Sequence, residues 1–273
     1  MRNQSDLSVL ASEMKAAQDN ALYVELFTER IPGFDMATGY EIAQIIHRKR
    51  LAEGSTVIGR KIGFTNPDMW ASYGVGEPIW AHIYDDTVEF LLETLGECEL
   101  YRFVEPKIEP EIVIQFIKTP GPGTGVAGLL NAIGWVAHGF EIVQSHFKGW
   151  KFQAADTVAD WALHGRLLVG PRRALHELGR DPIFALESFM LTLSCNGKVI
   201  ETGKGSNVLG SPLAAVEHLL EVLESQANAM PLQAGEIVTT GTITAAHSVH
   251  AGEVWSSSVR GIALPGLAVS FPE

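Results

Sequence analysis

Two glutamates separated by a single residue, Glu109 and Glu111, form the pattern in this chain with the clearest potential for chemistry. They lie in a run, residues 108–116, that alternates as a β-strand does, so both carboxylates would project from one face. Their Cα atoms would be roughly 7 Å apart, two strand steps of about 3.3 Å each. Like charges this close repel each other, and partial burial raises the cost. A divalent cation that accepts both carboxylates removes this cost, and hard ions such as Mg²⁺ favour oxygen ligands.

A third acid, Glu141, stands alone in the apolar segment 139–143. Charged side chains are seldom buried without a partner, so Glu141 could complete a three-carboxylate site whose remaining positions are open to water or substrate. The alternative is structural, with Glu109 and Glu111 on a solvated strand face and Glu141 in an ion pair. The residues alone do not favour either interpretation.

Lys61 is the second candidate, because it lies between two glycines in the strand-like segment 57–64. Alternation would put Gly59, Lys61 and Gly63 on one face, and the glycines would leave space beside the amine for a ligand. Lys61 could then hold a substrate carboxylate, or donate a proton if burial lowers its pKa. A surface lysine on an edge strand is the alternative, and the residues alone favour it.

Other polar residues carry weaker signals. Asp156 and Asp160 are four positions apart and would share a helix face, although Asp156 also fits a helix N-cap. His146 is a candidate general base, with a surface histidine as the default interpretation. His247 and His250 lack the spacing of a helical metal site, so both are predicted to lie in loops.

Hydrophobic spacing divides the chain into a helical beginning and a strand-rich remainder. Spacings of three and four residues predict helices over 5–20 and 38–53, and an amphipathic helix that begins near Pro212. Strands are predicted at 57–64, 88–92, 108–116, 140–143, 189–195, 236–240 and 267–271. The Asn196-Gly197 pair predicts a hairpin turn. This order indicates a small helical N-terminal part joined to a larger mixed domain rich in antiparallel strands.

The composition narrows the classes of partner. A net charge of −12 repels phosphate backbones, so we expect no nucleic-acid partner. The first residues lack the apolar stretch of a signal peptide, and the apolar part of the longest uncharged stretch, 119–140, is too short to span a bilayer. We therefore expect a soluble cytoplasmic protein that does not contact membranes. Cys98 and Cys195 are too few and too isolated for a disulfide framework or a zinc site.

Six segments, in order along the chain, resemble the 2-keto-4-pentenoate hydratase and 4-oxalocrotonate decarboxylase family of the fumarylacetoacetate hydrolase superfamily. They are Gly59–Asn66, Glu109–Ile112, Glu141–Val143, Asp156–Asp160, Val208–Leu213 and Ala234–Thr244. The resemblance implies an α+β fold, with a mixed β-roll catalytic domain over residues 76–273 and a smaller helical N-terminal part over residues 1–75. It also implies a homo-oligomer, commonly a pentamer or decamer, and a complex with another enzyme of the same pathway.

The resemblance further implies an Mg²⁺ or Mn²⁺ ion and roles for particular residues. Glu109, Glu111 and Glu141 match the family's metal ligands, and Lys61 matches its active-site lysine. The expected substrate contacts are Phe64, Asp156 and Thr242.

The chain departs from the family pattern at three places. Gln144-Ser145-His146 stands where the family often has Asp-Ser-Arg, and Thr240–Thr244 stands where it has Ser-Gly-Ser-Leu-Thr. Asp160-Trp161 replaces an Asp-Asn pair. We expect these differences to line the substrate pocket, so they bear on the substrate more than on the metal chemistry.

The function that the resemblance implies is hydration of a 2-hydroxy-2,4-dienoate, a small 2-oxo acid precursor, in the catabolism of aromatic compounds. The dienol would tautomerise to an unsaturated 2-keto acid and water would add at the far conjugated carbon, giving a 4-hydroxy-2-oxo acid. The metal would stabilise the charge on the C2 oxygen. Phe64, Trp80 and Trp150 are candidates to cover the apolar tail of the substrate.

Three alternatives remain open. A decarboxylase of the 4-oxalocrotonate type would use the same enolate chemistry, but its second carboxylate needs another cation, for which His146 and Lys151 are candidates. A C–C hydrolase or a keto-enol tautomerase of the superfamily is another enzyme class. A non-catalytic partner subunit is the last alternative, and the clustered acids argue against it.

Overall fold

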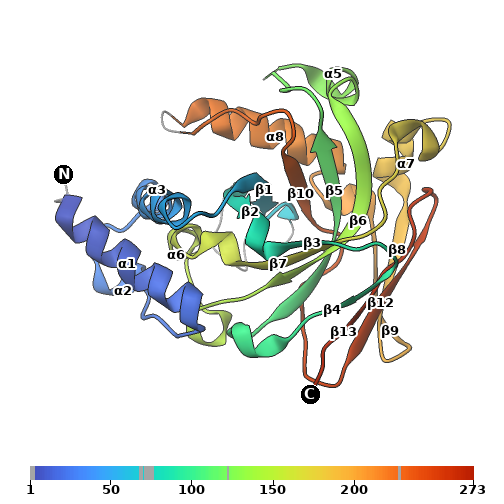
Figure 1. Ribbon diagram of the computed structural model, residues 1–273. Helices are drawn as coiled ribbons and strands as arrows, with labels where there is room; N and C mark the ends of the chain where they lie inside the picture. Colours follow the sequence, from blue (N-terminus) through green and yellow to red (C-terminus); the bar gives the residue numbers. More distant parts are fainter. Residues whose placement is uncertain (1–3, 68–69, 71–76, 122, 227–228) are drawn as a thin grey trace.

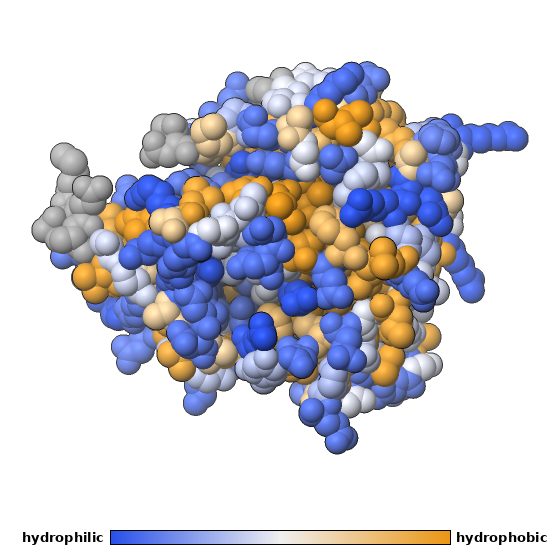
Figure 2. All heavy atoms as spheres, viewed as in Figure 1, coloured by the Kyte–Doolittle hydropathy of each residue, from blue (hydrophilic) through white to orange (hydrophobic). Residues whose placement is uncertain are grey.

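A computed structural model describes residues 4–67, 70, 77–121, 123–226 and 229–273 (Figure 1). One β-sheet crosses the middle of the molecule, with helices from the N-terminal part beside its β1–β2 end, and a second sheet lies at the lower right of the view. Figure 2 shows polar side chains over much of one face, with apolar side chains gathered across its middle. The predicted α+β class is therefore confirmed, while the predicted domain boundary after residue 75 lies outside the described residues.

The first sheet holds most of the residues singled out by their chemistry. Its strands, in spatial order, are β2 (Ile79–Tyr84), β1 (Val57–Gly63), β10 (Ile237–Thr242), β5 (Lys107–Phe116), β6 (Ile133–Val143), β7 (His164–Val169) and β3 (Val88–Phe90), and the short β11 (His247–Ser248) also pairs with β5. β1 runs parallel to β10, whereas β5 is antiparallel to both β10 and β6. Three stretches that are distant in sequence therefore lie side by side in the middle of this sheet.

The second sheet encloses the main hydrophobic core against the first. Its order is β4 (Leu95–Glu97), β13 (Ala268–Ser270), β12 (Val254–Arg260), β8 (Met190–Cys195) and β9 (Lys198–Lys204). The predicted hairpin at Asn196-Gly197 is confirmed, because both residues have positive φ and join β8 to β9. The alternate residues Ile108, Ile112 and Ile114 of β5 are buried in the core, so the acids of β5 lie on the opposite face.

The helices form two groups. α1 (Gln4–Asn20), α2 (Phe27–Arg30), α3 (Met36–Ala52) and α6 (Ala154–Ala159) share a second apolar cluster next to β1 and β2 (Figure 1). The second group packs against the main core and consists of α5 (Gly125–Leu130), α7 (Pro182–Ser188) and α8 (Pro212–Ser225). Capping explains where α3 and α8 begin. At α3, the Asp35 side chain accepts a hydrogen bond from the Thr38 backbone N–H. At α8, the Ser211 side chain accepts from the Leu213 backbone N–H, and Pro212 occupies the first helical position.

The predicted elements agree with the structure where the hydrophobic period is regular. The helices over 5–20 and 38–53 and the helix at Pro212 are present within a few residues of their predicted bounds. The strand predicted at 140–143 is only the end of β6, and His247, predicted in a loop, lies in β11. Strands β2, β4, β7 and β12 were not predicted. β7 and β12 mix polar and apolar residues without a clean alternation, and β2 is a short, nearly continuous apolar run whose period does not distinguish a strand from a helix.

No helix in the described ranges combines the length and apolar character needed to cross a bilayer. Cys98 and Cys195 are both free thiols, the first buried and the second partly exposed.

Candidate metal centre and active site

The pairing of β5 with β6 brings three carboxylates together. Glu109 lies directly opposite Glu141 in the antiparallel register, and Glu111 follows two residues along β5 on the same face. One oxygen from each of the three glutamates lies within 4.8 Å of the others. The three acids that the sequence analysis selected therefore face one another from two neighbouring strands.

Glu141 uses only one of its carboxylate oxygens inside the protein. Its Oε1 lies 2.9 Å from Lys61 Nζ and 2.7 Å from His164 Nδ1. The other ring nitrogen of His164 hydrogen-bonds the Thr87 hydroxyl at 2.9 Å, which fixes the orientation of the imidazole. Oε2 of Glu141 is buried and has no hydrogen-bond partner among the described atoms. A buried carboxylate oxygen in this state lacks a positively charged neighbour or a donor.

Glu111 is held by the backbone of β10. The Gly241 N–H donates to Glu111 Oε2 at 2.9 Å. Gly241 has φ of +98°, and a Cβ there would lie 1.8 Å from the hydroxyl oxygen of Thr65. Only glycine meets both conditions, so the close approach of β10 to the segment after β1 depends on this residue.

The pKa values of the four charged groups reflect burial and mutual repulsion. Burial raises the pKa of Glu109 to about 7, against the opposing effect of Lys61, and burial together with Glu141 raises the pKa of Glu111 well above its usual range. Burial also opposes ionisation of Glu141, but Lys61 and His164 hold its pKa at about 2. Burial would lower the pKa of Lys61, yet the three glutamates outweigh it and raise that pKa.

This arrangement fits a divalent cation. The cluster offers three carboxylates within 4.8 Å of one another, and it leaves Glu141 Oε2 without a partner. Burial and the neighbouring glutamates raise the pKa values of Glu109 and Glu111 against the opposing effect of the single ammonium of Lys61, so further positive charge at this point would stabilise the ionised carboxylates. An all-oxygen site of this kind suits Mg²⁺ or Mn²⁺, with the remaining coordination positions open to small ligands.

Lys61 is not the surface lysine of an edge strand. Its strand, β1, lies between β2 and β10, and the side chain is almost fully buried. The expected open space beside Lys61 is present at Gly63 but not at Gly59. Gly63 lines a cavity, whereas at Gly59 a Cβ would lie 2.2 Å from the carbonyl oxygen of Ile237. Gly59 therefore serves the close packing of β10, and the ligand space lies on the Gly63 side.

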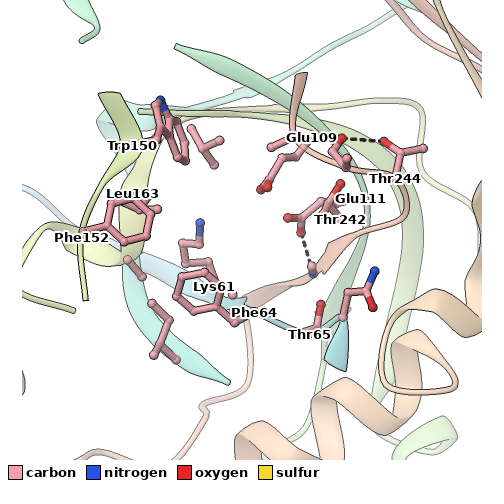
Figure 3. Close-up of a pocket in the computed structure, with 18 residues that line it drawn as sticks. Lys61, Phe64, Thr65, Glu109, Glu111, Trp150, Phe152, Leu163, Thr242 and Thr244 are labelled. Atoms are coloured by element: carbon pink, nitrogen blue, oxygen red, sulfur yellow. Dashed lines mark hydrogen bonds between the residues drawn. The ribbon is translucent and has the colours of Figure 1, made fainter. Parts of the chain in front are cut away.

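A cavity with an empty volume of about 700 Å³, its open mouth included, lies directly over these groups (Figure 3). Lys61, Glu109 and Glu111 line it together with the hydroxyl residues Thr65 and Thr242. The polar residues Asn66 and Thr244 also line it. The large apolar side chains of the described wall are Phe64, Ile79, Val143, Trp150, Phe152 and Leu163. In Figure 3, Trp150, Phe152 and Leu163 lie across the cavity from Glu111 and Thr242. The cavity is thus polar at one end and apolar at the other.

The family of the chain follows from comparison with known sequences. A family model described as fumarylacetoacetate (FAA) hydrolase C-terminal matches residues 86–265. The chain belongs to this family. The matched region includes the strands that carry all three glutamates, whereas Lys61 lies before it.

Individual relatives extend the likeness over the whole chain. A 4-oxalocrotonate decarboxylase from Pseudomonas putida is 30% identical over 92% of each chain, and a 2-keto-4-pentenoate hydratase from Paraburkholderia phymatum is 29% identical over the full length of both. Among solved structures, 4-oxalocrotonate decarboxylase from Pseudomonas putida G7, complexed with magnesium and adipate, matches with a TM-score of 0.88 at 28% identity. That match covers 99% of each chain. The predicted family and its fold are therefore confirmed.

The predicted substrate contacts fall into two groups. Phe64 and Thr242 line the cavity, so their contact with substrate stays a prediction. Asp156 is fully buried away from it, and its carboxylate accepts from the backbone N–H and hydroxyl of Thr28 and from the backbone N–H of Gln153. The structure does not bring Asp156 to the cavity, which removes the predicted contact. Its carboxylate instead holds the start of α6 against α2.

Of the three departures from the family pattern, only one lines the cavity. Gln144 and His146 are buried outside the cavity, and His146 Nδ1 pairs with Asp160 Oδ1 at 2.7 Å. Neither His146 nor the exposed Lys151 lines the cavity, so neither is placed to bind a second substrate carboxylate. Only the departure at Thr240–Thr244 forms cavity wall, through Gly241, Thr242 and Thr244. The expectation that all three departures line the pocket is therefore wrong for two of them.

Two polar residues, His164 and Thr65, lie close to the glutamates and Lys61 and were not predicted from the sequence. His164 contacts Glu141 from β7, a strand that was not predicted, and nothing local marks it among nine histidines. Thr65 lies just past the predicted strand, and its buried hydroxyl has no partner within the described structure. Trp80, a candidate for the apolar wall, packs in the main core instead.

Proposed function

We propose that this protein is a metal-dependent hydratase that adds water to a 2-hydroxy-2,4-dienoate and yields a 4-hydroxy-2-oxo acid, in the catabolism of aromatic compounds. The observation that carries the proposal is the cluster of Glu109, Glu111 and Glu141 beside Lys61, at the polar end of a largely apolar cavity. The relatives named as hydratases and decarboxylases support the same lyase chemistry.

The three glutamates would hold Mg²⁺ or Mn²⁺, which, when bound, supplies Lewis acidity toward the carboxylate and C2 oxygen of the substrate. Lys61 stays charged because its pKa is raised by the glutamates, so it acts as an ammonium that attracts the C1 carboxylate. The ion pair with Glu141 fixes its position at the floor of the cavity. Preorganised charge of this kind stabilises the enolate that forms when the dienol tautomerises.

Two hydroxyls are available for the steps that involve protons and water. Thr65 and Thr242 line the cavity, and the described structure gives neither buried hydroxyl a hydrogen-bond partner. Each can donate to a substrate oxygen or orient the attacking water. Phe64 and Phe152 exclude bulk water from the conjugated tail.

A decarboxylase of the 4-oxalocrotonate type is the second candidate, and the cavity favours it less. A dicarboxylate needs a cation or several donors at its far end. Within the described wall, Lys61 is the sole cationic side chain, and it already contacts Glu141.

The proposal is tested by following the absorbance of 2-hydroxypenta-2,4-dienoate and the mass of its product. We expect turnover with Mg²⁺ or Mn²⁺, a gain of one water in the product, and loss of activity after chelation that added metal restores. Glu109→Gln should lower kcat/KM at least about 100-fold. Activity that survives both chelation and this substitution would overturn the scheme, and faster release of CO₂ from 4-oxalocrotonate would favour the decarboxylase.

We also propose that the chain acts in the cytoplasm as a homo-oligomer. Exposed apolar side chains on and after β3, at Phe90, Leu92 and Leu95, supply a surface that association would bury. Light scattering of the purified protein measures the assembly, and a monomer at micromolar concentration would contradict this.

A further inference from the structure

A second lysine lies just behind the apolar end of the cavity. Lys107 precedes Glu109 by two residues on β5, so it shares the strand face of the acids. It lies directly opposite Val143 of β6, which lines the cavity, although Lys107 itself does not. Its ammonium is 3.8 Å from the ring centroid of Trp150, and the indole of Trp150 is part of the cavity wall. The indole thus contacts both the cavity and this cation.

Trp150 is held in this position by several contacts. Its backbone is left-handed, with φ of 56°, which is uncommon for a bulky residue. The indole N–H donates to the backbone oxygen of Glu105 at 2.9 Å, and the preceding Gly149 N–H donates to the Glu105 carboxylate at 2.9 and 3.1 Å. The Tyr23 hydroxyl donates to the same carboxylate at 3.0 Å. A strained residue that its surroundings fix so firmly is typical of functional sites.

The remaining wall at this end offers nothing to a negative charge. Trp150, Phe152, Leu163 and Val143 are aromatic or aliphatic, and of the described lining side chains only Lys61 carries positive charge. A carboxylate placed there would lose its hydration without gaining a partner, which is costly. A terminal methyl or other uncharged tail would gain from the same surface.

We propose that Trp150 determines the substrate class: by covering Lys107, it restricts the site to 2-hydroxydienoates and 2-oxo acids with uncharged tails and excludes those with a second carboxylate. Removal of the indole exposes the ammonium of Lys107, and a dicarboxylate can then pair with it. This inference rests on the proposed function, since it takes the glutamate cluster as the end that binds the 2-oxo acid.

The test measures binding of two unreactive acids to the full-length protein with Mg²⁺, by calorimetry. 2-Oxopentanoate has an uncharged tail and 2-oxohexanedioate ends in a carboxylate. We expect the wild type to bind the monoacid at least about tenfold more tightly, and Trp150→Ala to reduce this ratio at least about tenfold by improving diacid binding. Trp150→Leu is a second variant with a smaller volume change, and circular dichroism checks the fold of both.

Two controls separate the charge of Lys107 from the added space. Adding Lys107→Met to Trp150→Ala should abolish the gain for the diacid, whereas Lys107→Met alone should leave the wild-type ratio unchanged. Phe152→Ala opens the same wall without exposing a cation, so it should not favour the diacid. Two results would overturn the inference and leave the hydratase proposal intact. One is equal binding of both acids by the wild type, and the other is improved binding of the diacid by the double variant that lacks Lys107. Failure of both acids to show Mg²⁺-dependent binding would contradict the proposed function, and this inference with it.

Discussion

At the scale of single residues, the site depends on how Glu141 divides its two carboxylate oxygens. Oε1 is shared by Lys61 and His164, and Oε2 is buried without a partner in the described structure. The ammonium and a metal ion would therefore bind the same carboxylate through different oxygens. Their positive charges repel each other, so Lys61 weakens metal binding while it prepares the site for an anionic substrate.

Lys61→Met separates these two effects. Loss of the ammonium leaves three carboxylates with less compensating charge, so we expect Mn²⁺ to bind about tenfold more tightly. Turnover should fall at least about 100-fold, because the positive charge facing the substrate carboxylate is lost. Calorimetry with Mn²⁺ and the dienoate assay measure the two quantities. Lys61→Arg, which keeps the charge, is the control, and weaker Mn²⁺ binding by Lys61→Met would contradict this interpretation.

At the scale of elements, β10 links the metal cluster to the strand that carries Lys61. It pairs with β1 on one side and β5 on the other, and its register with β5 shifts between Thr239 and Thr242. Gly241 lies in this irregular stretch, where its N–H reaches Glu111. The position of Glu111 is therefore set by the local path of β10 as well as by β5.

Gly241→Ala tests this link. The positive φ and the contact with the Thr65 hydroxyl oxygen together should lower the free energy of unfolding by about 2–4 kcal/mol. Gly235→Ala is a matched control, because Gly235 also has positive φ, at 96°, but a Cβ there meets nothing within 4 Å. Gly235→Ala should lower the free energy of unfolding by about 1 kcal/mol and leave the Mg²⁺ affinity unchanged. Gly241→Ala should weaken Mg²⁺ binding as well. Denaturant titration and calorimetry report both effects; equal effects of the two variants would argue against a special role for Gly241.

The faces of single strands could be predicted from the sequence, whereas the pairing between strands could not. Alternation placed Glu109 and Glu111 on one face correctly, because the two-residue period of a strand does not depend on its partners. The pairing of Glu109 with Glu141 depends on the register of β5 and β6, and these strands are joined by residues 117–132 and not by a tight turn whose length would fix that register. His164 reaches the site where the β6–β7 register shifts after Ile142, so its role was invisible in the sequence.

At the scale of the whole molecule, the site lies where the first sheet meets the helical N-terminal part. The Trp161–Leu163 turn that follows α6 has three successive residues with positive φ, and Ala162 and Leu163 of this turn line the cavity. Asp156 of α6 bonds Thr28 of α2 and so ties the N-terminal helices to this wall. The packing of the helices therefore shapes the cavity, although the chemistry lies on the sheet.

The raised pKa values of Glu109 and Glu111 should make the stability of the metal-free protein fall as the pH rises. Bound metal should have the opposite effect, because it stabilises the folded protein most where these carboxylates are ionised. In the metal-free protein the pKa of Glu109 is raised to about 7 and that of Glu111 well above 4.5, so between pH 5 and 7 the folded state binds more protons than the unfolded chain. Stability from these groups is present below about pH 4.5 and is lost as the pH rises through the folded-state pKa values. Glu141, whose pKa is lowered to about 2, loses its contribution only in stronger acid, outside this window.

Thermal melts of the chelated protein should therefore show a Tm that falls from pH 5 to pH 8. The fall should be smaller in Glu109→Gln, which lacks one of the two titrating groups. Divalent ions bind the ionised carboxylates, so Mg²⁺ at 100 times its Kd should raise the Tm at pH 8 by about 5–10 °C and much less at pH 5. Glu236→Gln is a control for general electrostatics, because Glu236 pairs with Arg60 away from the cavity. It should keep the pH-dependent response to Mg²⁺. An Mg²⁺-induced shift of equal size at pH 5 and pH 8 would mean that the three carboxylates are not the groups whose ionisation controls metal binding.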